Sequence, residues 1–178
     1  GNANLIIGKF TISTWVKFNK ANLPAIGYGG VITQWWDGSK RNFDLLVYKA
    51  TGYAYIEVGN SAGSSANTLM GTVNIGDDKW HNITATYDKN KIKLYTDGIY
   101  NNEVAKTDDI SPNNANLMIG NLSHTTNTAY FSGSIDDIRI YDASMPISQI
   151  KEQYFAGLNS LLASSSITFD EYTSRIDS

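Results

Sequence analysis

The chain contains no cysteine among its 178 residues. This absence excludes disulfide bonds, thiolate metal sites and a cysteine nucleophile. No apolar run approaches the roughly 20 residues that a membrane-spanning helix needs, so the sequence predicts no membrane span. The formal net charge is only −3 and there is no block of lysines or arginines, so the electrostatic signature of a nucleic-acid-binding protein is missing.

Charged residues make up only 17% of the chain, whereas apolar residues make up 42%. A surface with so few charges has to present neutral polar groups, chiefly asparagine, serine, threonine and glycine, and this is typical of extracellular β proteins. The length predicts one ordinary domain, or one domain with an appendage, that is large enough to bury a core.

The segment 79–98 carries the clearest structural pattern. Apolar and polar side chains alternate after residue 81, so Ile83, Ala85 and Tyr87 share one face, as in a half-buried β-strand. A polar turn follows, and the segment ends on an Asp-Gly dipeptide, which favours a tight hairpin turn. The pattern therefore predicts two antiparallel strands closed by turns.

Three stretches of the sequence are specific enough to suggest a family. They are Phe-Thr-Ile-Ser-Thr-Trp-Val at 10–16, the Trp-His strand with its Leu-Tyr-Thr-Asp-Gly hairpin at 79–98, and Gly-Ser-Ile-Asp-Asp-Ile-Arg-Ile-Tyr at 133–141. Together they resemble laminin-G-like domains of the concanavalin A-like superfamily, over about residues 10–150. The resemblance implies an all-β fold, an antiparallel jelly-roll β-sandwich, in a secreted or surface recognition protein. Animal versions often carry a disulfide, so the absence of cysteine favours a bacterial origin.

The C-terminal end departs from the family pattern and predicts a short helical appendage. Apolar residues recur at helical spacing after Pro146, namely at Ile150, Tyr154, Leu158, Leu161 and Leu162. Thr168 with Glu171 three positions later forms a capping box that begins a second short helix. We therefore expect a sandwich over 1–145 and a helical tail over 146–178, which packs on the sandwich or tethers the module to a larger assembly.

The sequence does not predict catalysis. Acid–base cleavage of a glycosidic bond needs two carboxyl groups that face each other across the substrate. The chain has no Glu-x-Asp-x-x-Glu run, and its glutamates are scattered at Glu57, Glu103, Glu152 and Glu171. His81 stands beside Trp80 in a family motif and is expected to be structural, and His124 lies in a polar loop with no partner nearby. We therefore expect no enzyme.

Asp136 and Asp137 are the candidate metal ligands. Calcium takes several oxygen ligands at one point, and the resemblance implies a structural calcium ion near an edge of the sandwich. The competing interpretation is that one of the two aspartates caps backbone amides or pairs with Arg139. Adjacent residues on a regular strand would also point to opposite faces of the sheet.

The candidate ligand-binding residues lie in one predicted loop and comprise Trp35, Trp36, Asp37, Arg41 and Asn42. Flat aromatic rings stack on sugars, and short polar side chains bind sugar hydroxyls. Because alternate strand residues face opposite ways, one of the two tryptophans must point away from the core. The competing interpretation is that one tryptophan closes the end of the sandwich and the other covers a neighbouring loop.

These features predict a non-catalytic extracellular recognition module that binds glycans or mediates adhesion within a larger cell-surface protein of bacterial type. Its expected partner is a glycan or a surface protein, and this function requires an exposed Trp35 or Trp36. The alternative is a structural or assembly domain of a surface appendage such as a pilus, with an exposed apolar stripe at Leu158, Leu161 and Leu162. A glycan-active enzyme would instead require two carboxylates that converge in a cleft.

Overall fold

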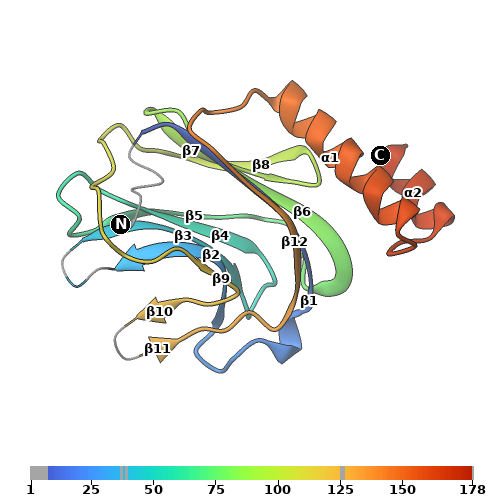
Figure 1. Ribbon diagram of the computed structural model, residues 1–178, viewed down its shortest axis with the longest axis horizontal. Coiled ribbons are helices and arrows are strands. Elements are labelled where there is room, and N and C mark those ends of the chain that lie inside the picture. The colour runs from blue at the N-terminus through green and yellow to red at the C-terminus, as the bar shows by residue number, and fades with distance from the viewer. Residues whose placement is uncertain (1–7, 37, 39, 125–126, 178) are drawn as a thin grey trace.

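The structure is a computed structural model that describes residues 8–36, 38, 40–124 and 127–177, without the side chains of residues 36, 123, 124, 127 and 128. Two five-stranded antiparallel sheets pack face to face (Figure 1). The first, called the β1 sheet, has the order β12 (Gly133–Tyr141), β1 (Phe10–Asn19), β6 (Asp77–Tyr87), β7 (Lys91–Thr96) and β8 (Ile99–Ala105). The second, called the β3 sheet, has the order β5 (Ala66–Met70), β4 (Ala54–Gly59), β3 (Arg41–Tyr48), β2 (Tyr28–Trp36) and β9 (Met118–Ile119).

Smaller elements complete the chain. A short hairpin pairs β10 (Ser123–His124) with β11 (Asn127–Thr128), and a 3₁₀ turn, η1 (Lys20–Asn22), follows β1. Two helices, α1 (Ile147–Ala163) and α2 (Phe169–Ile176), end the chain. The all-β sandwich with a C-terminal helical appendage is thus confirmed. The structure extends β2 to Trp36 and begins β3 at Arg41, whereas the sequence predicted one loop over residues 35–42.

The main core lies between the two sheets and follows the alternation of the strands. On β1 the inward side chains are Phe10, Ile12, Val16 and Phe18, all essentially inaccessible to solvent. On β3 they are Phe43, Leu45 and Val47, which belong to the same cluster. Because successive strand residues point to opposite faces, the residues between them, including Trp15 and Asp44, point outward.

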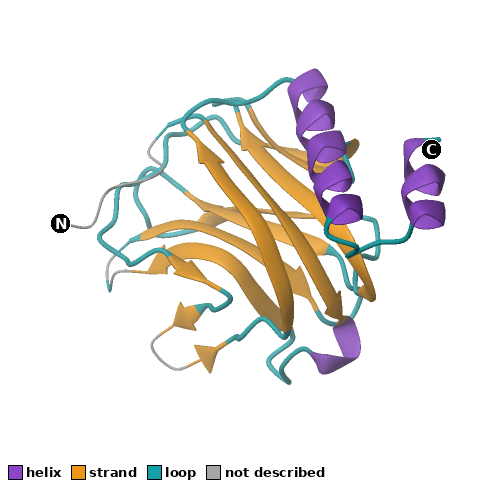
Figure 2. Ribbon diagram, turned by 45° about the vertical axis from the view of Figure 1, so that its right-hand side comes forward, coloured by secondary structure: helices purple, strands orange, loops and turns teal. Residues whose placement is uncertain are grey.

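The two helices lie on the outer side of the β1 sheet (Figures 1 and 2). The predicted capping box is present, since the Thr168 hydroxyl accepts a hydrogen bond from the Glu171 amide at 3.1 Å. A second apolar cluster joins the tail to the sandwich and contains Trp15, Tyr154, Leu158, Leu161 and Ile167. The predicted apolar stripe of the tail is therefore packed against the sandwich rather than presented to a partner.

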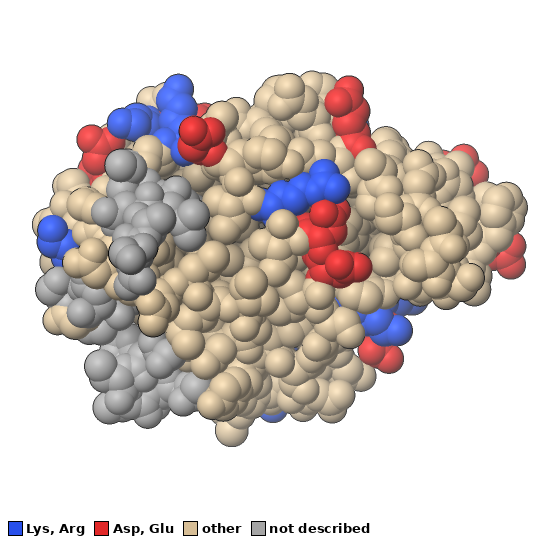
Figure 3. Space-filling model, viewed as in Figure 1, with Lys and Arg blue, Asp and Glu red and all other residues tan. Residues whose placement is uncertain are grey.

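Charged groups are sparse on the surface. On the face drawn in Figure 3, acidic and basic atoms are scattered among a large majority of uncharged residues, as the composition led us to expect. Neither helix in the described part of the chain is long and apolar enough to cross a membrane.

Candidate functional site

Three of the predicted ligand-binding residues, on β2 and β3, make contacts within the domain. Trp35 retains only 9% of its accessible surface, and the guanidinium carbon of Arg41 lies 5.5 Å from its ring centroid. Asn42 is fully buried, and its amide nitrogen donates a hydrogen bond to the backbone oxygen of Ser111 at 3.2 Å. Trp35 therefore presents little open ring surface for stacking on a sugar.

The other two predicted ligand residues are not placed. Asp37 lies outside the described residues, and so does the side chain of Trp36. Sugar binding through this turn between β2 and β3 stays a prediction.

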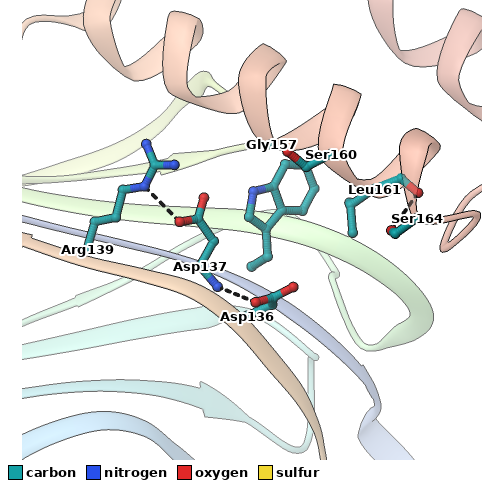
Figure 4. Close-up of a pocket in the computed structure, with 8 residues that line it drawn as sticks. Asp136, Asp137, Arg139, Gly157, Ser160, Leu161 and Ser164 are labelled. Atoms are coloured by element: carbon teal, nitrogen blue, oxygen red, sulfur yellow. Dashed lines mark hydrogen bonds and ion pairs between the residues drawn. The ribbon is translucent and has the colours of Figure 1, made fainter.

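Asp136 and Asp137 line one pocket of about 340 Å³ between β12 and α1 (Figure 4). The expectation that they point to opposite faces is corrected by a β-bulge. Ser13 pairs with Arg139 and Trp15 with Asp136, so a single residue of β1 faces two residues of β12. A bulge of this kind bends the strand and re-aims side chains.

The contacts of the two aspartates match the alternative to a metal site. Asp136 Oδ1 accepts a hydrogen bond from the Asp137 amide at 2.8 Å, and Arg139 Nε donates to Asp137 Oδ1 at 2.8 Å (Figure 4). Among the described residues, no group of three or more histidine, cysteine or acidic side chains is arranged to hold a metal ion. A calcium ion at this place stays a prediction.

The outward face of the β3 sheet brings together residues that the sequence did not connect. Asp44 and Glu57 are direct cross-strand partners on β3 and β4. The Tyr28 ring centroid lies 5.1 Å from that of Tyr48 and 5.8 Å from that of Tyr55. These five residues are called the tyrosine face below. The three tyrosines and Glu57 are half-buried, so parts of them remain open to solvent.

The two carboxyl groups of the tyrosine face have different surroundings. Tyr55 donates a hydrogen bond to Glu57 Oε1 at 3.0 Å. Burial raises the pKa of Glu57, although the Tyr55 hydrogen bond and the Arg41 charge work against that rise. Asp44 is fully buried, and neither of its oxygens has a hydrogen-bond partner among the described residues. Burial, and then the charge of Glu57, raise the pKa of Asp44 well above its usual range.

Of the two carboxyl groups of the tyrosine face, only Glu57 keeps a part open to solvent, because Asp44 is fully buried. Cleavage of a glycosidic bond by two carboxyl groups needs both of them at the scissile bond. Aromatic rings next to hydroxyl and carboxyl groups provide apolar contact together with hydrogen bonds. Strand alternation in the sequence could have shown that Asp44 and Glu57 point away from the core, because each of them stands between two core residues.

A scan against family models matches residues 1–151 to the concanavalin A-like lectin/glucanases superfamily. The chain belongs to this superfamily. The match confirms the resemblance of the sequence motifs and ends inside α1, so most of the helical tail lies beyond it. A comparison with curated proteins finds no match.

Solved structures share the superfamily fold. The binding domain of Paraclostridial Mosquitocidal Protein 1 superimposes with a TM-score of 0.66 and 16% identity, over 85% of this chain and 38% of that chain. A botulinum neurotoxin serotype D ligand binding domain in complex with N-acetylneuraminic acid has a TM-score of 0.64 and 15% identity, over 86% of this chain and 38% of that chain. A heptameric SAP-like pentraxin from Limulus polyphemus has a TM-score of 0.60 and 15% identity, over 82% of this chain and 69% of that chain. The chain thus spans well under half of the two toxin domains.

His81 lies between two aspartates, Asp77 and Asp97. Its Nδ1 lies 2.7 Å from Asp97 Oδ2, and its Nε2 lies 3.1 Å from Asp77 Oδ1. Burial alone would lower the pKa of His81, but the hydrogen bonds and charges of Asp97 and Asp77 outweigh burial and raise the pKa. The other charged residues that line the same open pocket are Lys79, Asp170, Glu171 and Arg175.

This pairing predicts a loss of stability in alkaline solution. A raised native pKa stabilises the fold fully below the histidine reference pKa of about 6.5, and the stabilisation disappears as the pH rises through the native pKa. The melting temperature should therefore fall as the pH rises above about 6.5, by about 2–4 °C for each kcal/mol lost. In His81→Gln the melting temperature should be lower at acidic pH and should fall less as the pH rises. His124→Gln, the only other histidine variant, serves as the control, and an unchanged pH profile in His81→Gln contradicts the prediction.

Proposed function

We propose that the protein is a non-catalytic glycan-binding module and that the tyrosine face is its binding surface. The observation that carries this proposal is the contact of Tyr28 with Tyr48 and Tyr55 beside the hydrogen-bonded Glu57 carboxyl group. Tyrosine rings provide flat apolar contact at a low entropic penalty, and their hydroxyl groups can both donate and accept hydrogen bonds. Sugars present the same combination of apolar ring faces and hydroxyl groups.

The comparisons support the same class of ligand. One solved structure of similar fold is described as a ligand binding domain in complex with N-acetylneuraminic acid. We further propose that the module works outside the cell, within a larger bacterial surface protein, where it contributes to adhesion. The alternative of an assembly domain receives less support, because Leu158 and Leu161 of its predicted contact stripe are buried against the sandwich.

A glycan array tests the proposal, with Tyr48→Ala as the decisive variant. Saturable binding of at least one glycan is expected, and Tyr48→Ala should weaken it about tenfold, which corresponds to 1.4 kcal/mol. Tyr100→Ala is the matched control, because Tyr100 is a half-exposed tyrosine on the other sheet. Unchanged binding in Tyr48→Ala, with loss in Trp36→Ala, would move the site to the turn between β2 and β3.

Two further measurements complete the array experiment. Adding a chelator tests whether the predicted calcium ion is needed for binding. The absence of binding to every glycan, with an unchanged melting temperature, would contradict the proposed function and favour the assembly role.

A further inference from the structure

We propose that the pocket between β12 and α1 is a second glycan subsite, which binds one ring of a neutral sugar through its hydroxyl groups. The inference rests on the proposed function for the class of ligand, but it concerns a different part of the molecule. The pocket opens on the outer side of the β1 sheet, whereas the tyrosine face lies on the outer side of the β3 sheet. The residues that line the pocket include Trp15, Asp136, Asp137, Arg139, Gly157 and Ser160.

The bulge in β12 aims two carboxyl groups into the pocket. Asp137 has a backbone φ of +48°, which lies in the left-handed region that residues other than glycine rarely adopt. The Thr14 hydroxyl holds the bulge by donating a hydrogen bond to the Asp136 backbone oxygen at 2.9 Å. Strained backbone of this kind is concentrated at ligand sites.

Each carboxylate keeps an oxygen available to a ligand. Asp136 Oδ1 is occupied by the Asp137 amide, and Asp137 Oδ1 is occupied by Arg139 Nε (Figure 4). The second oxygen of each carboxylate has no hydrogen-bond partner within the described ranges. The pocket therefore offers two charged acceptors next to the remaining donors of the guanidinium group.

The Trp15 ring lines the same pocket. Trp15 is 98% buried, and its Nε1 is closed to solvent and has no hydrogen-bond partner among the described side chains and backbone. The atom lies close to the α1 backbone at Gly157, where an added Cβ would collide with it. Glycine at this position lets the helix approach the indole closely.

The mixture of donors and acceptors selects the ligand. An ammonium group can only donate, so it leaves the remaining donors of the Arg139 guanidinium group without an acceptor. A carboxylate or phosphate can only accept, and it would meet two aspartates and a single arginine. A divalent cation cannot accept hydrogen bonds from the guanidinium group and would be repelled by the charge of Arg139. Neighbouring hydroxyl groups both donate and accept, and a volume of about 340 Å³, near the lower end for ligand pockets, suits one ring.

Half of the residues that line the pocket belong to the helical tail and follow the end of the family match. Gly157 and Ser160 lie on α1 after residue 151, where the superfamily match ends. The β1 sheet alone would present Asp136 and Asp137 on an open surface. The helix therefore converts a part of the superfamily fold into an enclosed site that depends on this appendage.

Nuclear magnetic resonance of the full chain tests the subsite directly. The four tryptophan indole N–H signals are recorded during titration with D-glucose, D-galactose, D-mannose and N-acetyl-D-glucosamine, and Trp15→Phe assigns the Trp15 signal. At least one of these sugars should shift the Trp15 signal saturably. N-acetylneuraminic acid, which carries a carboxylate, should not shift it, and neither should calcium chloride.

A pair of variants on α1 separates binding from helix stability. Ser160→Leu fills the pocket from an exposed position and should weaken the affinity about tenfold or more. Lys151→Leu adds the same side chain at an exposed position on the opposite side of the helix, because nine residues correspond to about two and a half turns. It should leave the affinity unchanged. Asp137→Asn, which tolerates the left-handed backbone, should also weaken binding about tenfold.

The outcomes distinguish this subsite from the proposed function. If none of the four sugars shifts the Trp15 signal, or if Ser160→Leu binds as the natural sequence does, the subsite is refuted. A shift caused only by N-acetylneuraminic acid or by calcium refutes its neutral-sugar character. In each of these cases, array binding that is lost in Tyr48→Ala would leave the proposed function intact. Tyr48→Ala itself should not change the Trp15 response.

Discussion

Leu158→Ala should lower the free energy of unfolding of the whole chain by about 2–5 kcal/mol. Leu158 is fully inaccessible to solvent and packs with Trp15, Tyr154 and Leu161 between α1 and the β1 sheet. Alanine would remove its buried methyl groups and leave a cavity, because Trp15 and Tyr154 are stacked at 5.5 Å and cannot collapse into the space. Urea denaturation, followed by tryptophan fluorescence and by circular dichroism, measures the loss.

Leu162→Ala is the matched control on the same helix. Leu162 is only half-buried, so the same substitution should be clearly less destabilising. The two spectroscopic signals should also remain coincident, because the tail and the sandwich share a core. If Leu158→Ala instead produced separate transitions for helix and sandwich, or changed stability no more than Leu162→Ala does, the tail would be an independent attachment.

The result would show whether the sandwich expected over 1–145 and the tail expected over 146–178 unfold as one unit. Helical periodicity in the sequence correctly indicated an apolar stripe on the tail, but periodicity does not say what covers the stripe. The covering residue is Trp15, which the alternation on β1 directs away from the other sheet. Trp15 is buried, and it is the tail that buries it.

Local patterns were sufficient for most of the sandwich. The alternation in β1 and β6 and the Asp-Gly turn after β7 were all predicted from neighbouring residues. The error at residues 35–42 arose because tryptophan, asparagine, glycine and charged residues together resemble a loop. In the structure, pairing between β2 and β3 continues to the Trp36–Arg41 pair and overrides the local preference.

The candidate sites depend on register, which a single sequence does not reveal. Asp44 and Glu57 are 13 residues apart and meet only because β3 pairs with β4 at that register. Tyr28 joins them from a third strand. The bulge at Asp137 was also hidden, because an aspartate with positive φ has no distinctive sequence signal. Only the structure therefore shows that Asp136 and Asp137 share a pocket.

The second large effect concerns the buried carboxyl group of Asp44. Asp44→Asn should stabilise the protein at about pH 8 by about 1–3 kcal/mol and should have little effect near pH 4. Below the usual aspartate pKa, both the folded and the unfolded states carry the proton, so burial incurs no ionisation penalty. As the pH rises toward the raised native pKa, only the unfolded state releases its proton, and the stability of the natural sequence falls. Denaturation midpoints at several pH values measure the difference.

Glu57→Gln is the control for this effect. Glu57 is half-buried and accepts the Tyr55 hydrogen bond, so removing its charge should change the pH dependence less. A loss of stability in Asp44→Asn at every pH would contradict the prediction and would mean that the carboxylate has a stabilising partner in solution. If Asp44→Asn is more stable at pH 8 and yet binds glycans less well on the array, the buried carboxyl group is kept for recognition at the expense of stability. That result would tie the tyrosine face to function through a residue that does not itself reach the surface.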